Sequence, residues 1–311
     1  MNQQQVKKTR GPVAPDGVIV VNKPGGWTSH DVVARIRGIA GTRRVGHLGT
    51  LDPIATGVLP VMVGQATRLA RFLENSAKTY DAVVRFGFAT NTYDRAGEPG
   101  PVSEVRLTPE RLEECLAPMR GEIDQVPPPG SAKKVGGVPA YKLARENKPV
   151  ELAPVRVRIE ELELKGFDGD RARIHVRCTT GTYVRSIAHA WGQSLGCGAH
   201  IDELVRTSSG AFTLEQAWSL DALQELKDAG RLAEAVMPLG ELPPGMTAVF
   251  VDENVTRQIR QGRDFHTSPF RTNAGSEFVR AIGPDGELVA IGQAVLPHLY
   301  HPVVVMATGE A

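Results

Sequence analysis

The chain has 311 residues, of which 41% are hydrophobic and 23% charged, with a net charge of +1 at neutral pH. The length exceeds one ordinary domain of about 100–200 residues, so we expect one large domain and one small one around sizeable cores. Three widely spaced cysteines exclude a disulfide framework and a Cys-x-x-Cys metal site, and no apolar run of about 18 residues predicts a membrane span. The polar N-terminus is unlike a secretory signal, and we expect a cytoplasmic protein.

The small net charge conceals two segments of opposite sign. Residues 1–60 carry eight Lys and Arg against three Asp, a net charge of +5. Residues 200–241 carry three basic residues against eight acidic ones, a net charge of −5. Such a division is typical of a protein that binds a polyanion without being basic as a whole. Ordinary solvated surface charge explains it equally well.

The N-terminal part predicts a strand, a turn and a helix. Residues 17–21 are a continuous apolar run, and 23–26 contain the proline and two glycines of a turn. Thr28 or Ser29 can cap the helix that follows. Residues 66–75 predict a second helix. The apolar stripe of the first helix consists of Val32, Val33, Ile36 and Ile39.

Two alternating segments predict half-buried strands, at residues 79–90 and 171–178. Residues 124–150, between them, are rich in proline, glycine and basic residues and predict a long ordered loop. Gly181 turns the chain into another helix. Because strands and helices alternate irregularly, the pattern favours an α+β fold over a regular βαβ array. The inward residues are Tyr80, Ala82, Val84, Phe86 and Phe88 in the first strand, Ala172, Ile174, Val176 and Cys178 in the second, and Val184, Ile187, Ala188, Trp191 and Leu195 in the helix.

The C-terminal part predicts a separate small β domain. Residues 240–248 contain two prolines and two glycines, as at a domain boundary, and four short β-like runs follow them. We therefore expect a disordered basic tail at 1–15, a main domain at 16–245 and a β-barrel at 246–311.

The stretch "GHLGTLDPIATGVLP", residues 46–60, contains a single carboxylate, Asp52. It contains no second acid, cysteine or lysine, so a local two-carboxylate or metal site is excluded. Pro53 forces Asp52 onto extended backbone. From these residues alone, Asp52 is either a catalytic acid or the aspartate of an Asx turn.

This stretch resembles, at every position of the pattern, the signature of the TruB-type bacterial tRNA pseudouridine synthases. Further segments resemble the motifs of that family in the same order along nearly the whole chain. They are "VNKPGGWTSHDVV" (21–33), "KTYDAVVRFG" (78–87), "MRGEIDQVPPPGSAKKVGGVPAYKLAR" (119–145), "CTTGTYVR" (178–185) and "LGCGAHIDELVRTSSG" (195–210).

The resemblance implies a pseudouridine-synthase fold of the α+β class, with a mixed, largely antiparallel central sheet and a PUA-like, RNA-binding β-barrel at the C-terminus. An RNA-gripping insertion would span about 124–150. The substrate would be a uridine in the T loop of tRNA, at the position conventionally called 55, whose base is detached from C1′, turned and rejoined through C5. The resemblance implies a monomer acting without cofactor, metal or guide RNA.

The resemblance also assigns roles to individual residues. Asp52 corresponds to the essential aspartate, and Tyr80 to a tyrosine that stacks on the extruded base, an interaction of about 1–3 kcal/mol. Arg185 would lie in the first turn of its helix, unfavourable for a cation unless it pairs with Asp52 and keeps it ionised. The implied substrate-binding residues are His47, Tyr183, Leu204 and Lys23.

Purely structural interpretations of these residues stay open as well. Tyr80 lies in register with an apolar strand face and fits a core position, and His47 fits a surface loop. The chain departs from the family pattern at Gly130 and Lys133, in the insertion. It also departs in "TNTYDRAGE", residues 90–98, where two positions that are often acidic are Asn91 and Ala96.

Two other functions remain possible on sequence grounds. A tRNA chaperone that folds the T arm would share every RNA contact, so turnover alone separates it from an enzyme. A hydrolase with Asp52 as nucleophile would need a second acid, a metal cluster or an oxyanion motif nearby, and the sequence has none of them. Guide-RNA-dependent relatives share the catalytic motif, but the intact insertion favours a stand-alone enzyme.

Overall fold

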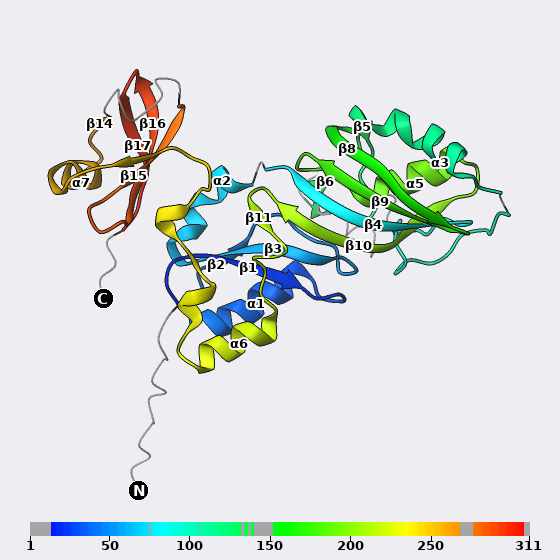
Figure 1. Ribbon diagram of the computed structural model, residues 1–311, viewed down its shortest axis with the longest axis horizontal. Helices are drawn as coiled ribbons and strands as arrows, with labels where there is room; N and C mark the ends of the chain where they lie inside the picture. Colours follow the sequence, from blue (N-terminus) through cyan, green and yellow to red (C-terminus); the bar gives the residue numbers. More distant parts are fainter. Residues whose placement is uncertain are drawn as a thin grey trace, which may run out of the picture.

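The computed structural model describes residues 14–74, 76–104, 106–131, 134–135, 138–139, 152–267 and 276–307. The predicted tail at 1–15 lies outside the described residues except for its last two, as do Lys133 and most of the predicted insertion. Two large sheets are formed, one by the main part of the chain and one by the C-terminal part (Figure 1). Within the described residues, no helix is long and apolar enough to cross a bilayer.

The N-terminal elements follow the predicted order: β1 (Gly17–Lys23), α1 (Ser29–Ala40), β2 (Val45–His47) and β3 (Thr56–Val63). Thr28 is the N-cap of α1. Its hydroxyl accepts a hydrogen bond from the Asp31 backbone N–H at 3.1 Å, and the Asp31 carboxylate accepts one from the Thr28 N–H at 2.8 Å. This capping box satisfies two backbone donors that the first turn leaves free. The four residues of the predicted stripe are buried, so the predicted helix is confirmed.

The helix predicted at residues 66–75 is different in the structure. A 3₁₀ helix spans Gly64–Leu69, and only one α-helical turn follows, α2 (Ala70–Leu73). Ala66 and Leu69 are both buried, and a spacing of three places them on the same side of a 3₁₀ helix. The same spacing also fits one side of an α-helix, so the apolar pattern does not distinguish the two kinds of helix.

The remaining elements of the main part complete the large sheet and its helices. They are β4 (Lys78–Phe86), α3 (Pro109–Leu116), β5 (Gly121–Gln125), β8 (Val155–Asp168), β9 (Arg171–Cys178), α5 (Val184–Ser194), β10 (Ala199–Ser209), β11 (Phe212–Thr213), α6 (Leu220–Asp228) and β12 (Met237–Pro238); β6 (Lys134–Val135) and β7 (Val138–Pro139) pair with each other separately.

The strand order of the large sheet is β12-β1-β3-β10-β4-β9-β8-β5, with β2 and β11 paired to its side. Only the β3–β10 pair is parallel; its other strand pairs are antiparallel. This confirms the mixed, largely antiparallel α+β sheet. In β4 the predicted inward residues are buried as far as Phe86, where the strand ends. Phe88 lies beyond that end and packs against the ring of His200.

Helices cover one face of this sheet. Apolar residues of α1, α5 and α6 share one buried cluster with the strands, and α3 packs beside α5 through Trp191, whose indole N–H donates to the Leu112 carbonyl at 3.0 Å. In Figure 1, α1 and α6 lie near β1 and β3, whereas α3 and α5 lie near β8 and β9. The buried cluster is continuous across the junction between β3 and β10, because it contains residues of both strands.

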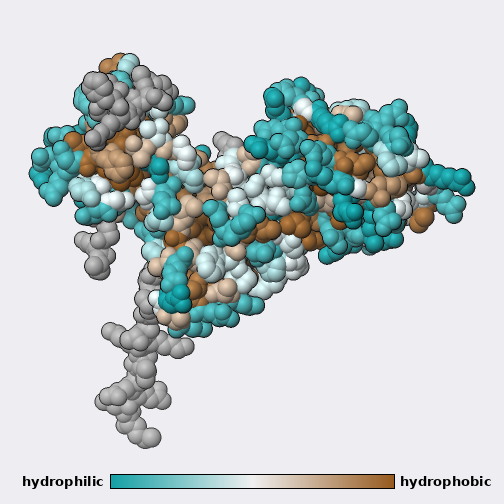
Figure 2. Space-filling view, viewed as in Figure 1, coloured by the Kyte–Doolittle hydropathy of each residue, from teal (hydrophilic) through white to brown (hydrophobic). Residues whose placement is uncertain are grey.

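The C-terminal part forms a curled half-barrel. Its strands are β13 (Ala248–Phe250), β14 (Phe265–His266), β15 (Phe278–Ile282), β16 (Leu288–Leu296) and β17 (Leu299–Val305), in the order β13-β15-β16-β17-β14, with α7 (Glu253–Arg260) beside them. Figure 2 shows hydrophobic residues over the strands and hydrophilic residues over α7.

The half-barrel is docked onto the main sheet through a shared apolar core. Gln65 reinforces the junction, because its side-chain amide donates to the Ala307 carbonyl at 3.0 Å and accepts from the Ala307 N–H at 2.6 Å. Arg280 donates to the Gly240 carbonyl at 2.6 Å. Removal of the half-barrel would expose this core. Its buried members include Val18, Val20, Leu48, Val58 and Met62 from the main part and Leu242, Ile282, Leu288, Ile291, Val304 and Met306 from the C-terminal part.

The parallel β3–β10 pair depends on Gly57, which has φ +97° and faces Arg206 in the register. A Cβ atom there would lie 2.3 Å from the Arg206 carbonyl oxygen. We expect Gly57→Ala to lower the free energy of unfolding by about 2–4 kcal/mol through backbone strain and overpacking, measured by urea denaturation. Gly46→Ala is the control, since the nearest atom to its Cβ is a methionine methyl at 3.5 Å. Equal losses in both variants would contradict this account.

Candidate functional site

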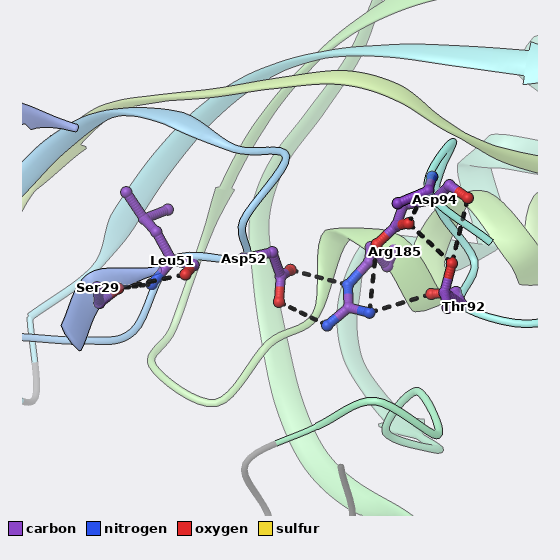
Figure 3. A network of polar contacts seen from close by, with 7 residues as sticks. Ser29, Leu51, Asp52, Thr92, Asp94 and Arg185 are labelled. Atoms are coloured by element: carbon purple, nitrogen blue, oxygen red, sulfur yellow. Dashed lines mark hydrogen bonds and ion pairs between the residues drawn. The ribbon is translucent and has the colours of Figure 1, made fainter. Parts of the chain in front are cut away.

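Asp52 lies in the connection between β2 and β3, and the backbone on both sides of it is fixed. The Ser29 hydroxyl accepts from the Leu51 N–H at 2.9 Å and lies 3.2 Å from the Leu51 carbonyl oxygen (Figure 3). The Pro53 carbonyl accepts from the Gly26 N–H at 2.8 Å. These contacts hold the Asp52 loop against the start of α1, so the direction of its side chain is set by the fold.

Asp52 does begin a turn, since its carbonyl accepts from the Ala55 N–H at 3.1 Å. Its carboxylate takes no part in that turn. Both of its oxygens accept hydrogen bonds from Arg185, from Nε at 2.8 Å and from Nη2 at 2.6 Å (Figure 3). The Asx-turn interpretation therefore does not describe this side chain, and the pairing of Asp52 with Arg185 is present as expected.

Arg185 lies in the first turn of α5, with only 5% of its side chain exposed against 27% for Asp52. Its remaining nitrogen, Nη1, donates to the Thr92 carbonyl at 3.0 Å and lies 3.5 Å from the Asp94 carboxylate. A bidentate pair fixes both position and orientation of the carboxylate. The guanidinium thus links the Asp52 loop to the loop that follows β4.

That second loop is itself held in place by Asp94 and Tyr93. The Asp94 carboxylate accepts from the Thr92 hydroxyl at 2.8 Å and from the Ala96 N–H at 3.0 Å. Tyr93 has φ +64°, unusual for a tyrosine, and its ring stacks on His189 at 3.7 Å. His189 lies one turn after Arg185 on α5, so neighbouring residues of the loop grip one face of that helix.

A pocket of about 230 Å³ opens beside Asp52. Five of the residues predicted from the sequence line it: Asp52, Tyr80, Tyr183, Arg185 and Leu204. They come from the Asp52 loop, β4, the start of α5 and β10, which are far apart in the sequence. Other lining residues are Lys78, Thr180 and Arg206.

The two tyrosines of the pocket are positioned differently. Tyr80 is 7% exposed and pairs across the strands with Arg206. Burial raises the pKa of its phenol, and the charge of Arg206 acts in the opposite direction. Tyr183 is half-buried, and the Gln125 side chain holds its backbone by accepting from its N–H at 2.8 Å and donating to its carbonyl at 3.1 Å.

Lys23 and His47 do not line this pocket. Lys23 is fully buried, and its ammonium donates to the carbonyls of Pro24, Trp27 and Pro53, so it ties the first turn to the Asp52 loop. Desolvation lowers its pKa to about 8. His47 lies on β2 with its ring 5.7 Å from that of His30, and burial lowers its pKa to about 4, so the ring is neutral at pH 7.

Burial raises the pKa of the Asp52 carboxyl, and the charge and hydrogen bonds of Arg185 oppose that rise. Asp94 adds to the rise through its negative charge. Arg185 therefore acts in the expected direction, but desolvation is the larger effect. Asp94, Tyr93 and His189 were missed from the sequence: the segment at 90–98 was noticed, but nothing in its spacing indicates contact with Arg185. Among the described residues, no group of three His, Cys, Asp or Glu could hold a metal ion.

Solved structures share this architecture. The Cbf5-Nop10-Gar1 complex contains a chain that matches with a TM-score of 0.68 and 25% identity over 94% of this chain and 84% of that one. An H/ACA ribonucleoprotein bound to a substrate RNA containing 2′-deoxyuridine matches with a TM-score of 0.70 at 24% identity, over 94% and 86% of the two chains. The second likeness is one of fold only.

Sequence comparisons define the family. The profile "TruB family pseudouridylate synthase (N terminal domain)" matches residues 37–184, and "tRNA pseudouridylate synthase B C-terminal domain" matches 185–242. The tRNA pseudouridine synthase B of Solibacter usitatus is 56% identical over 94% of this chain and 100% of its own length. That of Geobacter sulfurreducens is 41% identical over 79% and 82%. The chain belongs to the TruB family of pseudouridylate synthases, which confirms the resemblance.

The network around Asp52 predicts the effect of neutralising Asp94. Asp94→Asn removes a nearby negative charge that repels the Asp52 carboxylate. The carboxylate is then more stable, so the pKa of Asp52 should fall. Asparagine can still accept from Thr92 and Ala96 through its carbonyl oxygen. The measurement is a carbon-13 NMR titration of the Asp52 carboxyl. Asp81→Asn, an exposed change on the outer face of β4, should leave the titration unchanged. A rise in the Asp52 pKa on Asp94→Asn would refute this electrostatic account.

Proposed function

We propose that this protein isomerises a uridine of tRNA to pseudouridine, and that the uridine lies in the T loop at tRNA position 55. Membership of the TruB family supports the reaction. The observation that carries the catalytic assignment is the lone carboxylate of Asp52, gripped by Arg185 at the edge of a pocket that also contains Tyr80. A tRNA chaperone would require no such carboxylate, and a hydrolase would require further groups beside it.

A base inside the T loop is stacked, so the enzyme must extrude it, at a cost of a few kcal/mol. Tyr80 provides an aromatic face for the extruded base, while Tyr183 and Leu204 supply apolar walls. His47 lies outside the pocket, on the N-terminal side of the Asp52 loop, where it would occupy the space that the base vacates in the RNA. Lys23 acts on the substrate indirectly, by holding the Asp52 loop.

In the reaction, the C1′–N1 bond breaks with assistance from the Asp52 carboxylate, and the electron pair stays on N1 of the uracil. The base turns and C5 bonds to C1′. The proton on C5 is then lost, and N1 is protonated, so that atoms and charge balance. Arg185 keeps the carboxylate oriented toward the sugar throughout. No cofactor takes part in these steps.

We further propose that the protein acts as a monomer without guide RNA, on the T-arm stem-loop. Residues 16–245 would form the catalytic unit and the half-barrel within 246–311 a PUA-like RNA-binding unit. Exposed Arg257 and Arg260 supply basic groups on the α7 face of that unit, where Arg260 lies 3.5 Å from the Glu287 carboxylate. Such a face suits the phosphates of the acceptor arm, away from the target base.

The role of Asp52 is tested by Asp52→Asn, which keeps the shape and removes the charge. We expect pseudouridine formation in an unmodified T-arm stem-loop to fall by several orders of magnitude. The affinity for the stem-loop should stay near wild type, because phosphate and base contacts come from other residues. The melting temperature is measured alongside, since Arg185 loses one of its two carboxylate partners, and Asp81→Asn serves as control. A folded Asp52→Asn protein with near-normal turnover would eliminate the catalytic assignment.

The role of α7 is tested with Arg257→Gln/Arg260→Gln rather than by deletion, because deletion would expose the shared core. We expect weaker binding to full-length tRNA, with the slope of log K against log salt reduced by about 1–2, and little change for the isolated stem-loop. Arg111→Gln, an exposed change on α3, is the control for loss of surface charge. Equal losses on both RNAs would argue against acceptor-arm contact.

A further inference from the structure

Arg206 is a buried cation without a carboxylate partner. Its side chain, on β10, is 0% exposed. Nε donates to the Val58 carbonyl at 2.7 Å and Nη2 to the Gly49 carbonyl at 3.1 Å, while the buried Nη1 has no hydrogen-bond partner among the residues that the structure describes. Within the part of the chain that the structure describes, no acidic side chain forms an ion pair with it. Buried charges are ordinarily paired, so this arrangement requires an explanation.

The fold directs Arg206 to the substrate pocket. It is the register partner of Tyr80 in the β4–β10 pair, and it lies two residues after Leu204, on the same face of β10. All three residues line the pocket beside Asp52. Gly49, whose carbonyl accepts from Arg206, has φ +76°, a conformation that favours glycine.

The positive charge of Arg206 lowers the pKa of neighbouring basic groups. Desolvation lowers the pKa of Lys23 and of Lys78 to about 8 each, and repulsion from Arg206 contributes to both. It contributes also to the lowered pKa of His47, after desolvation and His30. The Asp52 carboxylate is engaged by Arg185 and does not bond to Arg206. The pocket therefore holds an excess of positive charge before any substrate is bound.

We infer that Arg206 stabilises the uracil ring electrostatically while the ring is detached from the sugar as an anion. This inference rests on the proposed function. When the C1′–N1 bond breaks, the electron pair leaves with N1, and the negative charge spreads over the ring and its two carbonyl oxygens. A base stacked on Tyr80 lies beside the cross-strand neighbour of that tyrosine. The charge on Arg206 is preorganised by two backbone carbonyls, so it needs no reorganisation as the anion forms.

Because the charge on the base exists only after cleavage begins, Arg206 should act on kcat and leave KM nearly unchanged. A role confined to supporting the fold would lower the amount of active protein and leave the dependence on the leaving base unchanged. A role in phosphate binding would instead raise KM and reduce the salt dependence of binding. These three roles therefore differ in measurable ways.

The experiment compares T-arm stem-loops with uridine or 5-fluorouridine at the target position, in single-turnover loss of the N1-linked nucleoside. In the fluorinated substrate C5 has no proton to lose, so the C5-linked product keeps its fluorine and takes up water, with the hydroxyl at C6 and the proton at N1. Fluorine stabilises the detached anion, so that substrate depends less on an external positive charge. For Arg206→Met we expect the uridine rate to fall about 100-fold and the ratio of the 5-fluorouridine rate to the uridine rate to rise several-fold. Arg206→Lys, which keeps the charge, should lose less than about 10-fold.

The ratio is taken within one preparation, so partial unfolding cancels from it, and melting temperature and stem-loop affinity are measured for each variant. Arg173→Met, an exposed change on β9, should match wild type in both rates. An unchanged ratio in Arg206→Met overturns the inference. A folded, RNA-binding Arg206→Lys variant whose uridine rate falls about 100-fold also overturns it. If wild type makes no pseudouridine from the uridine substrate, the proposed function itself fails, which is a distinct outcome.

Discussion

The bidentate contact between Arg185 and Asp52 is the interaction around which the site is organised. It joins a loop between two N-terminal strands to the first turn of a helix 133 residues later in the chain. A cation at that end of a helix is opposed by the helix dipole, and burial opposes the ionised form of the aspartate. Each group therefore depends on the other. Loss of Arg185 would leave the Asp52 carboxylate without its cation in a largely buried place, which costs more than the pair itself contributes, whereas loss of Asp52 would leave Arg185 with Asp94 alone.

The fold makes this contact possible through the parallel pair of β3 and β10 in the large sheet. If β3 and β10 were not adjacent, the Asp52 loop and the pocket residues of β10 would lie in separate halves of the sheet. Gly57 permits the close approach of these two strands, and the Arg206 guanidinium bonds across the same junction to Val58. The β3–β10 junction thus also forms a wall of the pocket, so changes that destabilise the junction distort the pocket as well.

The periodicity of the sequence was sufficient to predict α1, β4, β9 and α5, because each buries a regular face, and the family motif singled out Asp52. The pairing of Asp52 with Arg185 was predictable only because the motif supplied the carboxylate and Arg185 was expected at the end of a helix that is unfavourable for a cation. Asp94 and the Tyr93–His189 stack were not predictable, since they arise from an irregular loop whose path is set by tertiary contacts. The same holds for the core shared with the half-barrel, which joins residues more than 200 positions apart.

The cations around the pocket divide into two kinds. Lys23 and Lys78 each use three donors, Lys23 on backbone carbonyls and Lys78 on two carbonyls and the Thr180 hydroxyl, so they fix loops and have no donor left for a ligand. Arg185 is paired with carboxylates, whereas Arg206 is paired with none in the described part of the chain. A site with one functional carboxylate and a surplus of fixed positive charge is suited to a reaction in which the sugar becomes electron-poor and the departing base electron-rich. Asp52 and Arg206 then serve opposite ends of the same breaking bond.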